Sequence, residues 1–451
     1  MSCSLTHPIK ICHVIDASDG AAWVFDQLKG LRDLYGCDVA AVLSGDRGGL
    51  ADSLIRAAIP LHTADFVFHS PLDLLRLPWK LMALARLFRQ ERYQVVQSHL
   101  FRSMVMTRTA AWLADVPARF SMIAGPFHLE APTPRWIDGC TWWMETGIIA
   151  SCRHTRELYR DLGVPKDHIA LIFYGADQQR FDPRRTKPAD LKAEFGWPAD
   201  TKLIGMVARF YGHTNDRRWT PAQARGKSLK GHEDLIRATP EIIREFPNAK
   251  VLLIGGPWEE AGVRMMSSLH ALVAELGLGN SVIFTGFRSD IPEVLGALDV
   301  SVQPSLTDNL GGTIESLLME RPTVATRVGG LVDTVIDSKT GVLVAPNAPS
   351  ELAGAVIGLL HDPNRARSLG QAGRKYMLRG FTLHHTIDDL ASLYARARAT
   401  SGSGYRIYVT VLRLLLLGPI AAGVVLRYLV IDTLIPQIRE KFCNRAAHRG
   451  A

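Results

Sequence analysis

Short apolar runs alternate with stretches of helical periodicity along most of this chain. The first strands predicted from these runs are Ile9–Ile15, Asp38–Leu43, Gln94–Gln97, Arg119–Ile123, Gly147–Ala150 and Ile169–Phe173. A second series follows: Leu203–Val207, Lys250–Ile254, Ser281–Phe284, Val300–Gln303, Thr323–Thr326 and Gly341–Val344. Helical stretches lie between them, among them Leu235–Phe246, Leu269–Leu276 and Thr313–Glu320. Such alternation predicts an α/β fold with parallel sheets and right-handed crossovers.

A polar connection separates the two series of strands. It covers Asp177–Ala199 and contains the breakers Phe181-Asp-Pro and Gly196-Trp-Pro. Because 451 residues exceed the size of one typical core, we expect two Rossmann-like domains, at 1–185 and 186–400. Ligands of open α/β sheets bind beyond the carboxyl ends of the strands, so a cleft between the two domains is the expected site.

The residues after 400 do not continue this alternation of strands and helices. After a predicted helix at Leu383–Ala399, a short Gly/Ser linker leads into an apolar segment at 405–436. The cleanest apolar run, Leu414–Leu426, is shorter than the about 20 residues of a membrane span and contains Pro419. We therefore expect a membrane-associated helical tail at 401–451. An interfacial or re-entrant anchor is preferred, a true span comes second, and a buried C-terminal helix is the third possibility.

Composition narrows the range of partners. Lys and Arg outnumber Asp and Glu by 52 to 44, and such an excess suits nucleic acid, anionic lipid or a phosphorylated substrate. Aromatic and basic residues do not interleave as in single-strand binders, so we expect no nucleic acid. The six cysteines form no CxxC pair, which argues against a zinc site or a disulfide scaffold. No signal peptide is recognised before the first strand, so a cytoplasmic location is expected.

The most informative chemistry lies in the stretch that begins at Ser301 and reads SVQPSLTDNLGGTIESLLMERPTVATRVGG. Gly311 and Gly312 would allow backbone amides to approach an anion at the start of a helix. Asp308 precedes this turn and Glu315 lies in the first helical turn, where carboxylates can accept hydrogen bonds from sugar hydroxyls. The alternative is that Asp308 caps the turn and Glu315 favours the helix dipole.

This stretch resembles the sugar-nucleotide site of the retaining group 1 glycosyltransferases, the family of glycogen-synthase-like, sucrose-synthase-like and mannosyl-transferring enzymes. The resemblance implies the two-domain GT-B architecture, with an N-terminal acceptor domain and a C-terminal nucleotide-sugar domain. It implies that Glu315 holds the ribose and that Asp308 contacts the transferred sugar. The implied donor-binding residues of this loop are Asn309, Leu310, Gly311, Gly312 and Thr313. The family has two Glu residues separated by seven positions, whereas Asp308 and Glu315 are separated by six and Thr307 takes the strict position.

Two cations continue the resemblance. Arg209, in GMVAR, and Lys230, in KGHEDLI, look like the pair that clamps the nucleotide diphosphate. Two positive charges would neutralise the leaving group, so no metal or other cofactor is expected. An insert at Phe210–Leu229 departs from the family pattern, and it could be a disordered flap or add acceptor contacts. It also makes Lys227 a rival to Lys230.

Three weaker matches complete the candidate site. Arg288, in FTGFRSDIP, resembles the loop that packs against the nucleobase, although an ordinary turn would read the same way. Gly20, in SDGAA, resembles the family's glycine-rich loop near the phosphates. His128, in GPFH, follows a strand where family members carry a His near the donor sugar. A lone His is more often structural, and this applies to His99 as well. The resemblance covers Ile9–Ala399.

The implied function is transfer of a sugar, with retention, from a nucleotide-diphosphate sugar to a glycan or lipid-linked acceptor. The basic balance and the segment at 405–436 place this expectation at the cytoplasmic face of a bacterial inner membrane, with a peripheral or single anchor. Two alternatives stay open. One is another GT-B enzyme, such as an inverting transferase or a sugar-nucleotide epimerase. The other is a membrane-associated scaffold that kept the fold and lost turnover.

Overall fold

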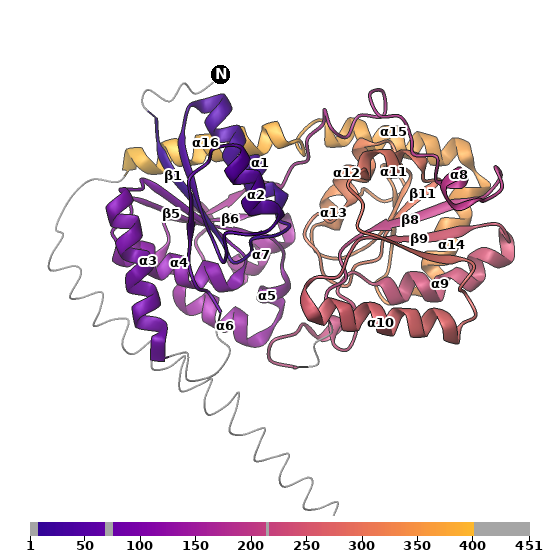
Figure 1. Cartoon of the computed structure of the whole chain (residues 1–451), viewed down its shortest axis with the longest axis horizontal. Coiled ribbons are helices and arrows are strands. Elements are labelled where there is room, and N and C mark those ends of the chain that lie inside the picture. Colours follow the sequence, from indigo (N-terminus) through magenta and orange to yellow (C-terminus); the bar gives the residue numbers. More distant parts are fainter. Residues whose placement is uncertain (1–7, 68–74, 213–215, 401–451) are drawn as a thin grey trace, which may run out of the picture. The chain divides into compact units, whose positions relative to one another are not determined.

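The fold consists of two open parallel sheets with connecting helices (Figure 1). It is known from a computed structural model that describes residues 8–67, 75–212 and 216–400. The seven-stranded sheet has the order β3-β2-β1-β4-β5-β6-β7, and the six-stranded sheet has the order β10-β9-β8-β11-β12-β13. The first strand of each series lies inside its sheet: β1 lies between β2 and β4, and β8 lies between β9 and β11. This is the arrangement of a doubly wound fold.

All twelve predicted strands are present. The first sheet contains β1 (Lys10–Ile15), β2 (Asp38–Leu43), β3 (Leu61–Thr63), β4 (Val95–His99), β5 (Ala118–Ile123), β6 (Gly147–Ala150) and β7 (Ile169–Leu171). The second contains β8 (Leu203–Val207), β9 (Lys250–Ile254), β10 (Val282–Gly286), β11 (Val300–Gln303), β12 (Thr323–Thr326) and β13 (Val342–Val344). Strand β3 was not predicted, because its three residues form no apolar run and it pairs with β2 at the edge of the sheet.

Helices fill the connections between the strands. The helices up to β8 are α1 (Ala22–Tyr35), α2 (Gly49–Arg56), α3 (Leu77–Glu91), α4 (Phe101–Leu113), α5 (Phe127–Glu130), α6 (Pro132–Thr141), α7 (Arg153–Asp161) and α8 (Leu191–Phe195). Those after β8 are α9 (His232–Glu245), α10 (Glu259–Glu275), α11 (Ile291–Ala297), α12 (Thr313–Leu318), α13 (Leu331–Thr334), α14 (Pro349–His361), α15 (Pro363–Met377) and α16 (Leu383–Thr400). Short 3₁₀ turns lie at Trp142–Met144, Lys166–His168 and Ala222–Ala224.

Two of these helices depart from the sequence prediction. Helix α8 lies inside the connection predicted to be polar and irregular; Asp190 caps its start by accepting from the Ala193 amide at 3.1 Å. Helix α10 begins ten residues before the predicted Leu269, because its first turns bury only Gly262 and Met265 and show no apolar stripe. Helix α8 is therefore marked by its capping residue, and neither start is marked by a hydrophobic period.

The core of the second sheet explains why its strands read as continuous apolar runs. Ile204, Val251 and Val300 are fully buried and belong to one cluster with residues of α9 and α14. Helices therefore cover this face of the sheet. This explains why its strands do not alternate between apolar and polar residues. Each such fully buried aliphatic side chain contributes about 1.5–3 kcal/mol relative to an exposed one.

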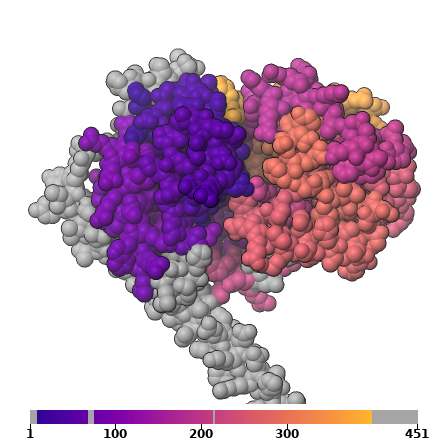
Figure 2. Space-filling view, in the orientation of Figure 1, coloured from indigo at the N-terminus to yellow at the C-terminus, as the bar shows by residue number. Residues whose placement is uncertain are grey.

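The chain separates into two compact units. The first unit contains the described residues within 8–122, 133–148 and 391–400, and the second contains 123–132 and 149–390. Figure 2 shows magenta segments against orange segments, which are distant in sequence, in the second unit. In this unit the Ala189 amide donates to the Glu293 carbonyl at 2.9 Å. The boundary proposed at residue 185 stays a prediction. Within the described residues no helix is both long and apolar enough to cross a bilayer, and the segment at 405–436 lies outside them.

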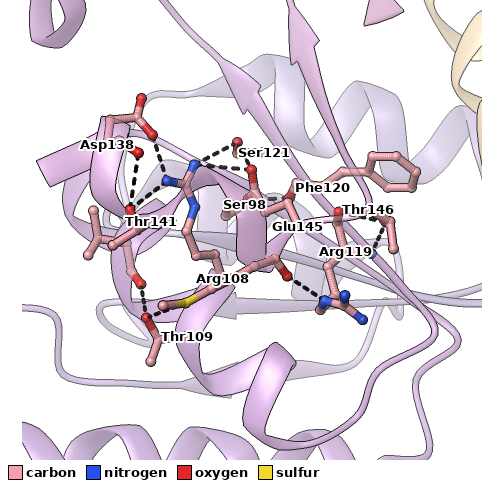
Figure 3. A network of polar contacts seen from close by, with 12 residues as sticks. Ser98, Arg108, Thr109, Arg119, Phe120, Ser121, Asp138, Thr141, Glu145 and Thr146 are labelled. Carbon is pink, nitrogen blue, oxygen red and sulfur yellow. Dashed lines mark hydrogen bonds and ion pairs between the residues drawn. The ribbon is translucent and has the colours of Figure 1, made fainter. Parts of the chain in front are cut away.

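A network of buried charges connects α4 with α6 and with the residue after the 3₁₀ turn Trp142–Met144 (Figure 3). The guanidinium of Arg108 donates to Asp138 Oδ1 at 2.6 Å and to Glu145 Oε2 at 3.0 Å, and all three side chains are inaccessible to solvent. Ser121 donates to the same oxygen of Glu145 at 2.8 Å. One cation thus serves two buried carboxylates. Burial raises the pKa of Glu145 to about 7, although Arg108 opposes the shift.

Candidate active site

The predicted donor residues of the second unit gather where its central strands end. Arg209 follows β8 by two residues, the loop 255–258 follows β9, and the loop 304–312 connects β11 to α12. Strands β8, β9 and β11 are parallel neighbours, so their carboxyl ends meet at one edge of the sheet. This edge is where open α/β sheets bind ligands.

Asp308 is a buried carboxylate whose partners come from its own unit. Its Oδ2 accepts from Lys230 Nζ at 2.7 Å and from Ser305 Oγ at 2.7 Å. Its Oδ1 accepts from the Asn309 amide at 2.9 Å. The bond from Nζ shows that Asp308 orients Lys230, while Ser305 and the Asn309 amide hold the carboxylate in place.

Lys230 is fixed to the β11–α12 loop through its backbone neighbours. The Leu306 amide donates to the Leu229 carbonyl at 2.9 Å. Gly231 has a φ of +72°, and a Cβ there would lie 1.9 Å from the Pro304 carbonyl oxygen, so only glycine fits. Burial by itself would lower the pKa of Lys230, but the adjacent Asp308 carboxylate and Tyr211 together outweigh it, and the pKa is raised. Lys230 is therefore a fixed positive charge at this edge.

Arg209 lies against aromatic rings of the neighbouring loops. Its guanidinium is 5.0 Å from the ring centre of Trp258 and 5.9 Å from that of Phe287. Tyr211 bridges the two cations, since its ring lies 6.0 Å from that of Trp258 and 5.9 Å from Lys230 Nζ. The two residues predicted to clamp a diphosphate are thus brought to the two ends of an aromatic pair, Trp258 and Tyr211.

The glycine pairs allow close approach of backbone segments around this loop. Gly311 has a φ of +53°, and a Cβ there would meet Asp308 Oδ2 at 3.1 Å. Gly329 has a φ of +50° and lies so close that a Cβ would be 1.9 Å from the Asp308 carbonyl oxygen. The backbone of the second glycine pair, at 329–330, therefore packs directly against the backbone of this loop.

The remaining residues predicted in this loop are mostly buried. Leu310 and Thr313 are buried, and the hydroxyl of Thr313 donates to the Leu310 carbonyl. Asn309 accepts from Ser151 Oγ at 3.0 Å. Glu315 is only partly buried in the first turn of α12, so of this group it is the acid with the larger exposed surface.

Arg288 is held by two carboxylates of the second unit. It donates to both oxygens of Asp290, at 2.9 and 2.7 Å, and to both oxygens of Glu194, at 2.6 and 3.1 Å. These hydrogen bonds raise the pKa of Arg288. The neighbouring Phe287, with 71% of its surface exposed, is the side chain that this loop presents to solvent.

The weaker candidates occupy different surroundings. His128 lies in α5, in the second unit, and is 8% exposed. Gly20 lies in the first unit, with a φ of +65°, between β1 and α1. His99 is fully buried in the first unit, 3.3 Å from His13 Nδ1 and 3.2 Å from Gln97 Nε2, and burial lowers its pKa to about 3. His99 therefore belongs to a neutral buried network rather than to an exposed site.

The insert at Phe210–Leu229 contributes to this region. Residues 213–215 lie outside the described residues, and the rest includes the 3₁₀ turn Ala222–Ala224. Lys227 donates to Asn347, whereas Lys230 pairs with Asp308, so the structure separates the two rival lysines. Gln223 Nε2 donates to Glu130 Oε2 at 3.0 Å.

Glu130 is a residue of this region that the sequence analysis missed. Its Oε2 also accepts from Thr307 Oγ1 at 2.6 Å. The available signal was an acid two residues after His128, in the same segment that follows β5. Nothing in the chain order linked it to Thr307. Among the residues that the structure describes, no group of three or more His, Cys, Asp or Glu could hold a metal ion.

Comparisons with known proteins agree with this architecture. Residues 209–376 match the sequence model described as "Glycosyl transferases group 1", and residues 20–175 match the "Glycosyl transferase 4-like domain". Anabaena HepE in complex with UDP and glucose superposes with a TM-score of 0.70 at 19% identity, covering 85% of this chain and 99% of that one. Sucrose-phosphate synthase from Thermosynechococcus elongatus gives 0.69 at 21% identity, covering 87% and 100%. The chain has the GT-B fold of these structures, and a glycosyltransferase sequence model matches part of each half of it.

Curated proteins of similar sequence are named as glycosyltransferases. The D-inositol 3-phosphate glycosyltransferase of Nocardia farcinica is 27% identical over 314 residues, which cover 68% of this chain and 63% of the relative. The 2-deoxystreptamine glucosyltransferase of Streptomyces kanamyceticus is 30% identical over 244 residues, covering 53% and 57%. The match thus spans about three fifths of the length of these relatives.

Proposed function

We propose that this chain transfers a sugar from a nucleotide-diphosphate sugar to an acceptor with retention of configuration. The observation that carries the proposal is the placement of Arg209 and Lys230 on one aromatic pair at the carboxyl edge of the second sheet. Similarity to named glycosyltransferases and to a structure that contains UDP and glucose supports a sugar nucleotide as the donor.

The donor diphosphate lies, in this proposal, against Arg209, Lys230 and the backbone at 311–313. Lys230 has three N–H donors, of which one is used by Asp308, so two can reach phosphate oxygens. Asp308 keeps the lysine charged and in place. Glu315, in the first turn of α12, accepts hydrogen bonds from the ribose hydroxyls.

The reaction forms one bond and breaks one bond at the anomeric carbon. The acceptor oxygen attacks on the face from which the diphosphate leaves, which retains the configuration. The departing phosphate oxygen takes the proton of the acceptor hydroxyl, so no separate base is needed. Arg209 and Lys230 stabilise the charge that develops on the leaving group. Since these two cations already offset that charge, we propose that turnover persists in the presence of EDTA.

The acceptor that we propose is a glycan or a lipid-linked sugar delivered at the cytoplasmic face of a bacterial membrane. The formal charge of +8 and the apolar sequence at 405–436 support a membrane surface as partner. The named relatives act on acceptors as different as inositol 3-phosphate and 2-deoxystreptamine, so the acceptor needs a direct assay.

The test is a panel of UDP-, GDP- and ADP-sugars offered to the whole protein. A true donor present at 100 times its dissociation constant stabilises the fold by about 2.7 kcal/mol, which raises the melting temperature. Arg209→Ala and Lys230→Ala should each abolish transfer while the protein stays folded, and NMR of the product should show the retained anomer. Near-normal turnover in both variants would overturn the proposed site, and an inverted product would overturn retention.

A further inference from the structure

The structure brings a carboxylate to the position where the glycosyltransferase motif lacks one. Thr307 stands at the strict place of the first motif acid, and its hydroxyl donates to Glu130 Oε2 at 2.6 Å. Glu130 comes from α5, 177 positions earlier in the sequence, and both residues belong to the second unit. A carboxylate therefore lies beside the motif position, although the sequence has no acid there.

Three side chains hold the Glu130 carboxylate in this position. Besides Thr307, Gln223 Nε2 lies 3.0 Å from Oε2 and His154 Nε2 lies 2.9 Å from Oε1. The side chain of Glu130 is 13% exposed, so it is neither sealed in the core nor free on the surface. A carboxylate has about four acceptor positions, and these contacts use three of them, which leaves room for a hydroxyl donor.

Asp308, the acid of the β11–α12 loop, also accepts three hydrogen bonds, but one of them comes from a lysine for which it is the countercharge. Its side chain is 6% exposed and accepts from Lys230, Ser305 and its neighbouring amide. Turning that carboxylate toward a sugar would leave Lys230 without its countercharge in a buried place, which is costly. The acid next to the motif position is therefore a poorer sugar ligand than Glu130.

We propose that Glu130 is the sugar-binding carboxylate of this site, accepting hydrogen bonds from hydroxyls of the transferred sugar beside Thr307. Thr307, Gln223 and His154 are positioning residues that orient it. The insert at Phe210–Leu229 then has a definite role, because its Gln223 helps to fix the acid. This inference rests on the proposed function, since it names a residue that reads the sugar part of the same donor.

The test separates recognition of the sugar from recognition of the nucleotide. The whole protein is titrated with UDP, GDP and ADP and with the matching glucose, N-acetylglucosamine and mannose donors, and turnover is measured with the best one. Glu130→Gln should lower kcat/KM by about 10- to 100-fold, the loss expected for a hydrogen bond to a charged group. Its affinity for the free nucleoside diphosphate should stay within threefold of the unaltered protein. Glu351→Gln, at an exposed carboxylate of the second unit that accepts the Ala345 amide, is the control for loss of one negative charge.

A second variant restores the acid from the motif side. Thr307→Glu alone places two carboxylates against each other and should reduce turnover, whereas Thr307→Glu combined with Glu130→Gln should recover activity relative to Glu130→Gln. Thr307→Val, which keeps Glu130 but removes its orienting hydroxyl, should cause a smaller loss and serves if Glu130→Gln folds poorly. Unchanged kcat/KM in Glu130→Gln, or no recovery in the double variant, overturns this inference alone. Failure of the unaltered protein to bind any sugar nucleotide overturns the proposed function as well.

Discussion

Lys230 and Asp308 form the pair on which the charge of the candidate site depends. Their atoms lie 2.7 Å apart, and their side chains are 20% and 6% exposed. A buried ammonium without a countercharge loses its proton more readily, because burial disfavours the charged form. The carboxylate of Asp308 therefore keeps Lys230 protonated, in addition to aiming it.

Asp308→Asn should move the high-pH limit of activity to lower pH. The raised pKa of Lys230 falls when the carboxylate is neutralised, so the lysine loses its charge at a pH where the unaltered protein keeps it. The measurement is kcat/KM for the best donor across pH 7 to 10. Lys230→Arg in the Asp308→Asn background should remove the shift, since arginine stays charged throughout. Coincident limits in Asp308→Asn and the unaltered protein would contradict the assignment.

Glu145 provides a separate prediction about stability. Its pKa rises from 4.5 to about 7 in the folded protein because it is buried. An acid whose folded pKa is raised stabilises the fold fully below pH 4.5, and this contribution disappears as the pH rises through 7. We expect the melting temperature of the unaltered protein, relative to Glu145→Gln, to fall between pH 5 and 8.

The comparison with Glu145→Gln is needed because other groups act in the opposite direction. Burial lowers the pKa values of His13, His99 and His232, and their contribution is lost as the pH falls. These residues are the same in both proteins, so the difference in melting temperature isolates Glu145. A pH-independent difference would show that Glu145 stays ionised beside Arg108.

At the scale of elements, the loops after β8, β11 and β12 make the site through backbone contacts that only glycine permits. Gly231 and Gly329 both have positive φ values, and a Cβ at either would lie 1.9 Å from a carbonyl oxygen of the β11–α12 loop. Helix α12 itself has only six residues. The precision of the site therefore comes from packed loops more than from a long helix.

Gly231→Ala should weaken donor binding and lower stability together. Alanine at a positive φ costs about 1–2 kcal/mol, and the contact with Pro304 forces a further shift of the Lys230 loop. Gly277→Ala is the matched control, because Gly277 has a φ of +66° and a Cβ there would have no neighbouring atom within 4 Å. Thermal melting and donor titration of both variants separate backbone strain from the clash. Equal effects in the two variants would show that the Pro304 contact does not matter.

At the scale of the whole molecule, the proposed membrane partner can be tested directly. The apolar sequence at 405–436 is the basis for a membrane partner. A chain shortened to end at Ser401 should no longer sediment with vesicles that contain anionic lipid, while its melting temperature with donor stays the same. Sedimentation of the shortened chain would place the membrane contact elsewhere, since the positive charge of the remaining chain could still bind lipid head groups.

Much of the fold could be predicted from the sequence because apolar runs and breakers act locally. Twelve of the thirteen strands among the described residues follow from runs such as Lys250–Ile254, which are apolar because both of their faces are packed. The three-residue strand β3 was missed, since an edge strand needs no such run. The candidate site residues Arg209, Lys230 and Asp308 were predicted from motifs that resemble those of a known family. They lie near one another because their loops follow neighbouring parallel strands of one sheet.

The sequence by itself thus determined the α/β class, the two series of strands and the cluster of charges at one sheet edge. Only the tertiary structure decided what those charges contact. Asp308 pairs with Lys230, and Arg288 pairs with Glu194 and Asp290. Glu130 accepts a hydrogen bond from Thr307. The physical reason is the distance along the sequence over which each effect acts. Hydrophobic period and turn chemistry are properties of neighbouring residues, whereas an ion pair joins whichever side chains the packed loops bring within about 3 Å.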